Sequence, residues 1–276
     1  MNTYLRQACL MIGLLVTLAV GTSPVHAEAS RFEAADSEGV TASRDRTTLY
    51  LQVDAEVKGP ISIPRLAAPL RSMAWEGMEA DSGLTLKPKP DTWEISWKAR
   101  PAEASKLVLS FDAPPLLMSE IKPIEATGDG SFYIPAHLAV TRGEKIRYEP
   151  QPSKNTVGFW VDGADFAVWT IHLEKPGRFK VAVLQGCGRG QGGSKASIWF
   201  HRWLDQGRVV PEPEMKLDFD VLETGHFQSF QWVHIGEAVL TQPGDTRIEV
   251  SPETIKKAAL MDIRAIHLIR LPDKKK

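Results

Sequence analysis

Hydrophobic and polar residues alternate in short runs along most of this chain, and a period of two predicts β-strands. In the first half, the runs cover residues 48–53, 61–63, 84–86, 93–97 and 106–111. Turn-forming sequences such as Lys58-Gly59-Pro60 separate these runs. The spacing predicts a small antiparallel β domain over residues 47–115.

A second series of alternating runs lies between residues 125 and 271. The clearest run is 165–173, in which Ala167, Trp169 and Ile171 share one face. Further predicted strands cover residues 131–134, 179–183, 197–201, 229–235, 247–250 and 263–268. The alternation predicts an all-β fold with two β domains.

Four segments fall outside this pattern. Residues 28–46 are polar without an apolar period and predict a flexible N-terminus. Residues 116–124 predict a linker, and residues 272–276 predict a basic tail. Residues 251–262 begin with Ser-Pro, which favours the start of a helix, so they are predicted as either a short helix or a turn.

The first 27 residues predict an export signal. Arg6 precedes an apolar run over residues 8–20, and small residues before Glu28 predict cleavage between Ala27 and Glu28. The run is shorter than the about 20 apolar residues that a membrane span needs. We therefore expect export to the periplasm or the extracellular space, with a retained membrane anchor as the alternative.

Composition narrows the range of partners and of stabilising bonds. The chain has a formal net charge of −1, and removal of residues 1–27, which contain Arg6 but no acid, makes it −2. This balance argues against a nucleic-acid partner, whose phosphates require a basic surface. Cys187 is the single cysteine after cleavage, so we expect core packing rather than an internal disulfide to stabilise the protein.

The first β domain resembles a known family in the order of its features. Thr48-Leu49-Tyr50-Leu51, residues 61–66 (ISIPRL), residues 70–73 (LRSM) and residues 105–113 (SKLVLSFDA) occur in sequence. This order is similar to the C-terminal β domain of family 29 α-L-fucosidases. In that family a catalytic barrel precedes the domain, whereas residues 28–46 precede it here. The resemblance therefore implies a β domain and assigns no catalytic residue.

The second β domain resembles family 6 carbohydrate-binding modules. The resemblance is carried by residues 132–136 (FYIPA), 155–162 (NTVGFWVD), 175–179 (KPGRF), 224–227 (TGHF) and 261–263 (MDI). These modules are galactose-binding-like jelly rolls that accompany secreted bacterial sulfatases and fucosidases. The resemblance implies that residues 125–271 form a jelly-roll β-sandwich.

The same resemblance implies a carbohydrate site. Phe159, with Trp160 beside it, and Phe227 match the aromatic positions of the family, and Asp262 matches an amide position. Aromatic rings suit sugars because one face of a sugar ring is apolar. His137 stands where the family has a glutamate tied to a structural calcium, so we expect no metal and no cofactor.

Other patterns have ordinary structural interpretations. Residues 188–193 match G-x-G-x-x-G, but a strand rather than a helix follows, so a glycine-rich hairpin loop is favoured over a nucleotide site. Cys187 is expected to be a small packed residue rather than a nucleophile. Asp162 and Asp165 are expected to shape a turn rather than to form a hydrolytic pair.

Histidines and tryptophans complete the candidate chemistry. His172, His201, His226 and His234 lack metal-ligand spacing. Trp169 and Trp232 lie in alternating strands and are expected in the core, whereas Trp199 and Trp203 are expected near the surface as a second-choice ligand patch.

The predicted function is that of an exported, non-catalytic carbohydrate-binding protein acting with separate polysaccharide-degrading enzymes. One alternative is a structural envelope protein that packs on a secreted glycosidase or sulfatase. A second alternative is a degenerate or truncated α-L-fucosidase.

Overall fold

The computed structural model describes residues 30–32, 37–79, 83–101, 105–204, 208–209 and 213–272. Within these ranges the chain is all-β, as the alternation predicts. The predicted signal peptide lies outside the described residues.

Eight strands form the N-terminal part of the described chain: β1 (Ser30–Phe32), β2 (Val40–Asp45), β3 (Thr48–Val53), β4 (Ile61–Pro64), β5 (Leu70–Trp75), β6 (Leu84–Pro88), β7 (Thr92–Trp97) and β8 (Lys106–Phe111). The C-terminal part contains β9 (Phe132–Pro135), β10 (Val140–Arg142), β11 (Arg147–Glu149), β12 (Thr156–Gly158), β13 (Phe166–Leu173), β14 (Gly177–Cys187), β15 (Lys195–Leu204), β16 (Arg208–Val209), β17 (Met215–Asp220), β18 (His226–Leu240), β19 (Gly244–Thr254) and β20 (Asp262–Arg270). Two 3-10 turns, η1 (Met118–Glu120) and η2 (Ala136–Leu138), complete the described elements.

The N-terminal part is a sandwich of two antiparallel sheets. One sheet has the order β1-β2-β3-β8-β5 and the other the order β4-β7-β6. Alternating residues of each strand face the core, as in β3, where Leu49, Leu51 and Val53 are fully buried. Trp93 stacks on Phe111 between the two sheets with ring centroids 6.3 Å apart.

The prediction of a flexible N-terminus over residues 28–46 is wrong for residues 30–32, which form β1 against β2, and for residues 40–45. Residues 40–45 form β2, which pairs with β3 along its whole length. Val40 and Ala42 are buried in the core, and their spacing of two is the apolar period. This apolar alternation covers only Val40 and Ala42, because the residues on either side of them are mostly polar.

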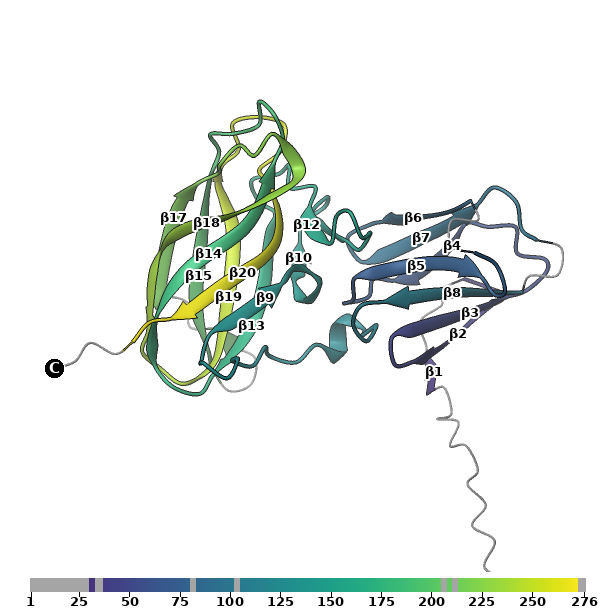
Figure 1. Cartoon of the computed structure of the whole chain (residues 1–276), viewed down its shortest axis with the longest axis horizontal. Coiled ribbons are helices and arrows are strands. Elements are labelled where there is room, and N and C mark those ends of the chain that lie inside the picture. The colour runs from purple at the N-terminus through teal and green to yellow at the C-terminus, as the bar shows by residue number, and fades with distance from the viewer. Residues whose placement is uncertain are drawn as a thin grey trace, which may run out of the picture.

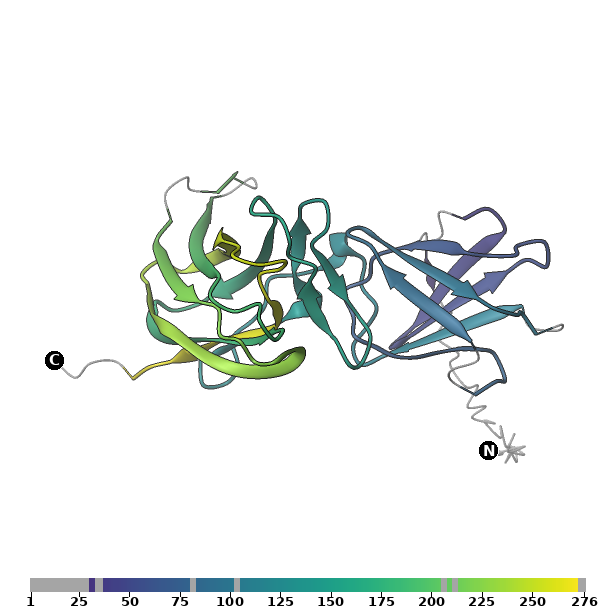
Figure 2. The same ribbon diagram turned by 90° about the horizontal axis from the view of Figure 1, so that it is seen from above.

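The C-terminal part is a jelly-roll sandwich of two antiparallel sheets, as predicted. The first has the order β10-β13-β19-β15-β16, with β17 also pairing with β15. The second has the order β11-β12-β20-β14-β18, with β9 also pairing with β20. Figures 1 and 2 show the two sheets face to face, beside the N-terminal sandwich.

Residues 251–254, left open as a helix or a turn, extend β19. Ser251 pairs with Ser197 of β15, and its Oγ accepts a hydrogen bond from Trp199 Nε1 at 3.1 Å. Strand pairing therefore uses the serine that would otherwise cap a helix. Residues 255–261 lead to β20 without a helix.

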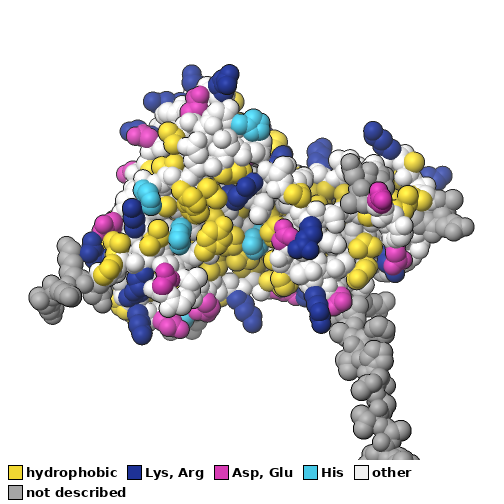
Figure 3. Space-filling view, viewed as in Figure 1, with side chains coloured by type: hydrophobic (Ala, Val, Ile, Leu, Met, Phe, Trp, Pro, Cys, Tyr) yellow, Lys and Arg dark blue, Asp and Glu magenta, His cyan; other side chains and the backbone are white. Residues whose placement is uncertain are grey.

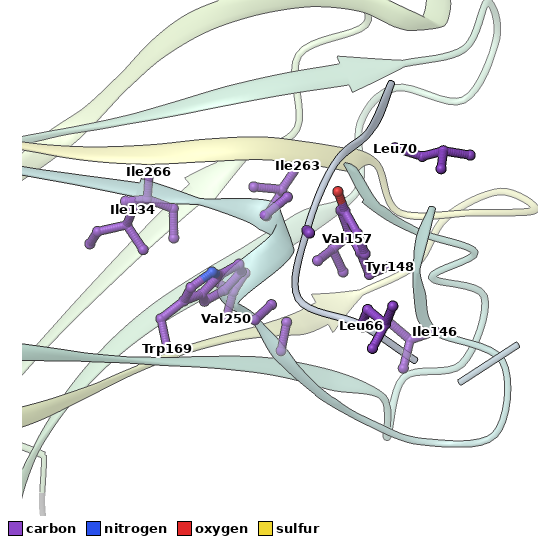
Figure 4. Close-up of a cluster of buried hydrophobic side chains, with 14 of the residues drawn as sticks. Leu66, Leu70, Ile134, Ile146, Tyr148, Val157, Trp169, Val250, Ile263 and Ile266 are labelled. Atoms are coloured by element: carbon purple, nitrogen blue, oxygen red, sulfur yellow. The ribbon is translucent and has the colours of Figure 1, made fainter. Parts of the chain in front are cut away.

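The two sandwiches share one continuous core. Leu66 and Leu70 of the N-terminal sandwich lie next to Tyr148 and Val157 of the jelly roll (Figure 4). The backbone N–H of Leu70 donates to the carbonyl of Pro150 at 2.9 Å. The connecting residues 116–124 pack along both parts, since Leu117 bridges to Leu66 and Ile124 bridges to Ile171.

Both helical turns in the described ranges have three residues, so neither is long enough to cross a lipid bilayer.

Candidate functional site

The candidate site is the outer face of the sheet formed by β9, β11, β12, β20, β14 and β18. In β9, Phe132 and Ile134 are buried in the core, so Tyr133 between them points outward and is 48% exposed. In β18, Trp232 lies on the same outer face and is 44% exposed. Figure 3 shows hydrophobic and histidine side chains gathered over these strands.

Strand register brings the aromatic residues together. Tyr133 pairs with His267 of β20, and Ala182 of β14 separates His267 from His234 of β18. Trp232 of β18 lies two residues before His234 and pairs with Leu184 of β14. The Trp232 centroid lies 5.9 Å from His267 and 6.5 Å from Tyr133. We call Tyr133, Trp232 and His267 the aromatic cluster.

An arginine continues the face beyond the aromatic cluster. Arg264 occupies an irregularity in β20, where the register shifts between its neighbours, and its guanidinium carbon lies 3.8 Å from the Phe230 ring centroid. Its Nε and Nη2 donate to the carbonyl of Lys154, and Nη2 also donates to the carbonyl of Ser153. The side chain is therefore held in place by a ring on one side and a loop on the other.

Two buried carboxylates form the far end of the face. Glu149 of β11 and Asp262 of β20 are 4% and 5% exposed. Both approach Gly158 of β12, where an added Cβ would lie 2.6 Å from Asp262 Oδ1 and 3.1 Å from Glu149 Oε2. Glu149 Oε1 is paired with Lys154 Nζ at 2.6 Å. We call Glu149, Lys154 and Asp262 the polar end.

Burial governs the ionisation of the polar end. Loss of solvent, with the nearby charge of Glu149, raises the pKa of Asp262 to about 8. Lys154 and Arg264 lower this pKa and only partly offset the rise. Asp262 is therefore mainly protonated at neutral pH and can both donate and accept hydrogen bonds.

The structure places three of the four predicted site residues at this same end of the sheet. Phe159 follows Gly158, has φ of 56°, and is 44% exposed, with the Arg147 guanidinium 3.2 Å from its ring centroid. Phe227 lies beside Gly188, where an added Cβ would come within 2.7 Å of its ring. Asp262 pairs with Gly186, which also approaches the Phe227 carbonyl.

Trp160 differs from the other predicted residues. Its side chain is fully buried, and its Nε1 donates to the carbonyl of Asp165 at 2.9 Å. The ring therefore has no exposed surface with which to contact a ligand. Trp160 instead helps to fix the loop that follows Phe159.

The remaining sequence candidates have structural roles. Asp162 Oδ1 accepts the N–H of Ala164 at 2.9 Å, which is an Asx turn, and Asp165 accepts the N–H of Ile146 at 3.3 Å. Cys187 is fully buried, and burial raises its pKa to about 11. Residues 188–194 form a loop between β14 and β15, and no helix begins there.

No histidine cluster of metal-binding geometry occurs in the described ranges. Burial and the neighbouring Arg65 lower the pKa of His137 to about 4, so its ring is neutral at neutral pH. Trp199 is half-buried on the opposite sheet, and the side chain of Trp203 lies outside the described residues.

Sequence reasoning missed Tyr133 and assigned Trp232 to the core, which is wrong. The signal for Tyr133 was available, because it alternates with Phe132 and Ile134, whose apolar side chains occupy the core positions. The signal for Trp232 was ambiguous, because β18 carries polar and apolar residues on both faces. Only the pairing with β14 identifies its outer face.

Comparisons with known proteins give partial likenesses. No protein-family model matches the chain, and no curated protein matches it. Among solved structures, a GH26-CBM35 β-(1,4)-mannanase of Podospora anserina aligns with 53% of this chain at 16% identity and a TM-score of 0.37. The chain spans 29% of that mannanase, which is less than a third of its length.

Two further solved structures are similar in part. The C-terminal CBM6 of the laminarinase LamC from Zobellia galactanivorans aligns over 98% of its length with 50% of this chain, at 16% identity and a TM-score of 0.38. An α-L-fucosidase from Vibrio sp. strain EJY3 aligns with 83% of this chain and 39% of its own length, at 11% identity and a TM-score of 0.32. At such scores these likenesses are no guide to what this chain binds.

Proposed function

We propose that this chain is a non-catalytic glycan-binding protein whose ligand lies along the outer face of the β9-β20-β14-β18 strands. The observation that carries the proposal is the aromatic cluster, in which Tyr133 and Trp232 are each close to half exposed and lie within 6.5 Å of one another. Large aromatic rings are normally buried, and this exposed pair offers an apolar surface in which the planes of Tyr133 and Trp232 are inclined at 68° to one another.

The chemistry of a sugar matches this face. The axial C–H groups of a pyranose ring form an apolar patch that stacks on Trp232 or Tyr133, while its hydroxyl groups need hydrogen-bond partners at the ring edge. His267 lies beside both rings and supplies such a partner. Further along the sheet, the half-buried Gln228, whose side chain is hydrogen-bonded to the buried Asp262, offers both a donor and an acceptor.

The predicted residues extend this surface. Phe159 is exposed near the polar end, and Phe227 lies beside Asp262. We propose that they contact sugar units beyond those held by the aromatic cluster. Trp160 supports the loop and does not contact the glycan.

The non-catalytic part of the proposal is supported by the state of the carboxylates. Glycoside hydrolysis needs two carboxyl groups on either side of the scissile bond. Glu149 and Asp262 instead both pack against Gly158, and Glu149 is already paired with Lys154. We propose that separate polysaccharide-degrading enzymes act with this protein after its export.

Site-directed variants test the glycan proposal. In affinity electrophoresis and on a glycan array, Trp232→Ala and Tyr133→Ala should each weaken binding by about tenfold or more, which corresponds to about 1.4 kcal/mol. Trp199→Ala, which removes a tryptophan from the opposite sheet, is the matched control and should bind as the unaltered protein does. Failure of every glycan to bind, or equal binding by Trp232→Ala and the unaltered protein, would overturn the proposal.

A second set of variants separates the two ends of the face. Phe159→Ala and Phe227→Ala should weaken binding of long oligosaccharides more than that of mono- or disaccharides. If these variants abolish all binding while Trp232→Ala leaves it intact, the proposed site at the aromatic cluster is overturned and the glycan lies at the polar end instead.

A further inference from the structure

Two arginines on this face have hydrogen-bonding groups that the described residues leave unused. The Arg147 guanidinium stacks on Phe159 at 3.2 Å, and its buried Nε has no hydrogen-bond partner among the described residues. Arg264 stacks on Phe230, and its bonds to the 153–154 loop use Nε and Nη2. Within the described ranges, nothing accepts a hydrogen bond from Arg264 Nη1.

Stacking fixes the orientation of both guanidinium groups. An arginine held flat on a ring loses less conformational freedom when it binds a ligand, because its fork of N–H donors is already in place. Such a fork matches the paired oxygens of a carboxylate or a sulfate. Both arginines therefore keep N–H donors that suit an anionic group, and in Arg264 the free donor is Nη1, because Nε and Nη2 bind the carbonyls of Ser153 and Lys154.

The local charge favours an anion. Arg147, Lys154 and Arg264 are three cationic side chains around the polar end, where Glu149 is paired with Lys154 and burial keeps Asp262 mainly protonated. The excess of positive charge contrasts with the formal charge of −1 for the whole chain. Ligand binding at a partly desolvated cationic site is strengthened by the low local dielectric.

We infer that the glycan bound by this face carries anionic groups, either uronic-acid carboxylates or sulfate esters, which Arg147 and Arg264 bind. This inference rests on the proposed glycan-binding function and adds the ligand class. The sugar ring stacks on the aromatic cluster, and the anionic substituent of a neighbouring unit lies between the two arginines.

The test uses two pairs of polymers that differ in charge on the same backbone. Polygalacturonate and its methyl ester test carboxylates, and dextran sulfate and dextran test sulfates. Isothermal titration calorimetry at physiological salt should give at least about tenfold tighter binding to the anionic member of one pair. The pair that shows the difference identifies the anionic group.

Variants distinguish specific recognition from general electrostatic attraction. Arg264→Met and Arg147→Met should each weaken binding of the anionic polymer by about tenfold. Lys180→Met removes an exposed charge of the same sign from β14 of the same sheet and should weaken it less than about twofold. Arg264→Lys, which keeps the charge but loses the fork, should retain folding as judged by circular dichroism and still lose affinity.

The negative results of these binding experiments overturn different claims. Equal binding of the charged and neutral members of both pairs, with loss on Trp232→Ala, would overturn the anionic class and leave glycan binding intact. Equal effects of Lys180→Met and Arg264→Met would also overturn it, because the attraction would then be general. Absence of binding to all four polymers and to every array glycan would instead overturn the glycan proposal itself.

Discussion

Aromatic and charged side chains have different contacts on the two outer faces of the jelly roll. On the β13-β19-β15-β17 side, Trp199 is covered by Lys216 Nζ, 4.4 Å from its ring centroid, and its Nε1 is bonded to Ser251. On the β9-β20-β14-β18 side, Tyr133 and Trp232 have no such cover and remain close to half exposed.

Ionic groups differ in the same way. The β13-β19-β15-β17 face carries several cation–carboxylate pairs: Lys216 with Asp218 and Glu253, Arg247 with Glu249, and His172 with Asp245. On the opposite face Arg178 pairs with Glu237 and Lys154 pairs with Glu149, whereas Arg147 and Arg264 stack on aromatic rings and have no carboxylate partner within ion-pairing distance in the described ranges. The comparison indicates that one face is a solvated surface whose charged side chains pair with one another, whereas the other face leaves Arg147 and Arg264 without an ion-pair partner in the described ranges and leaves two aromatic rings uncovered.

The largest effect is expected at Gly158, where the polar end tolerates no side chain. Gly158→Ala would place a methyl group 2.6 Å from Asp262 Oδ1, so we expect a loss of about 1–3 kcal/mol in the free energy of unfolding, together with weaker glycan binding. Gly163→Ala is the matched control, since no atom lies within 4 Å of its added Cβ. Urea denaturation checks both variants, and equal stability of the two would contradict the close packing.

The second-largest effect is expected from the buried carboxyl group of Asp262, which makes the free energy of unfolding depend on pH. The pKa of Asp262 is raised from 3.8 to about 8 by folding, so its stabilising contribution is complete below about pH 4 and is lost as the pH rises towards 8. The groups that face it are Glu149, Lys154, Gln228 and Arg264. At pH 9, Asp262→Asn should be more stable than the unaltered protein by at least about 1.4 kcal/mol, one pKa unit.

Thermal unfolding at pH 5, 7 and 9 checks this prediction. The difference between Asp262→Asn and the unaltered protein should grow with pH in favour of the variant. If the difference in stability between the two proteins is constant across this range, Asp262 is ionised throughout. The positive charge around the polar end would then be smaller than we infer.

The smallest effect is expected on the solvated face. Lys216→Met breaks two surface ion pairs, and exposed pairs contribute from zero to about 1 kcal/mol. The variant should therefore unfold within about 1 kcal/mol of the unaltered protein and bind glycans equally well. Acquisition of glycan binding by Lys216→Met would show that uncovering Trp199 is sufficient and would weaken the contrast between the two faces.

Many of the strands could be predicted from the sequence because their apolar and polar residues alternate over several positions. Thr48–Val53 and Phe166–Leu173 are examples, and both appear in the structure with their apolar residues inward. The missed strand β2 has only Val40 and Ala42 on its buried face. Residues 251–254 follow strand pairing instead of local capping signals, because the neighbour β15 is distant in the sequence.

The site could be predicted only in part. The family resemblance singled out Phe159, Phe227 and Asp262 as carbohydrate-binding residues, and they lie at one end of a sheet, while their role in binding stays a prediction. It could not show that Trp160 is buried, because neighbouring residues in a loop need not alternate. The aromatic cluster depends on the register of β9, β20, β14 and β18, whose members lie up to 134 residues apart, between Tyr133 and His267.

The most direct test of the central claim is to map the bound glycan by nuclear magnetic resonance on isotopically labelled protein. During titration with a binding oligosaccharide, the Trp232 indole N–H and the amides of Tyr133 and His267 should shift, while the Trp199 indole N–H stays unchanged. Shifts at Trp199 with none at Trp232 would contradict the assignment of the open aromatic face as the glycan site.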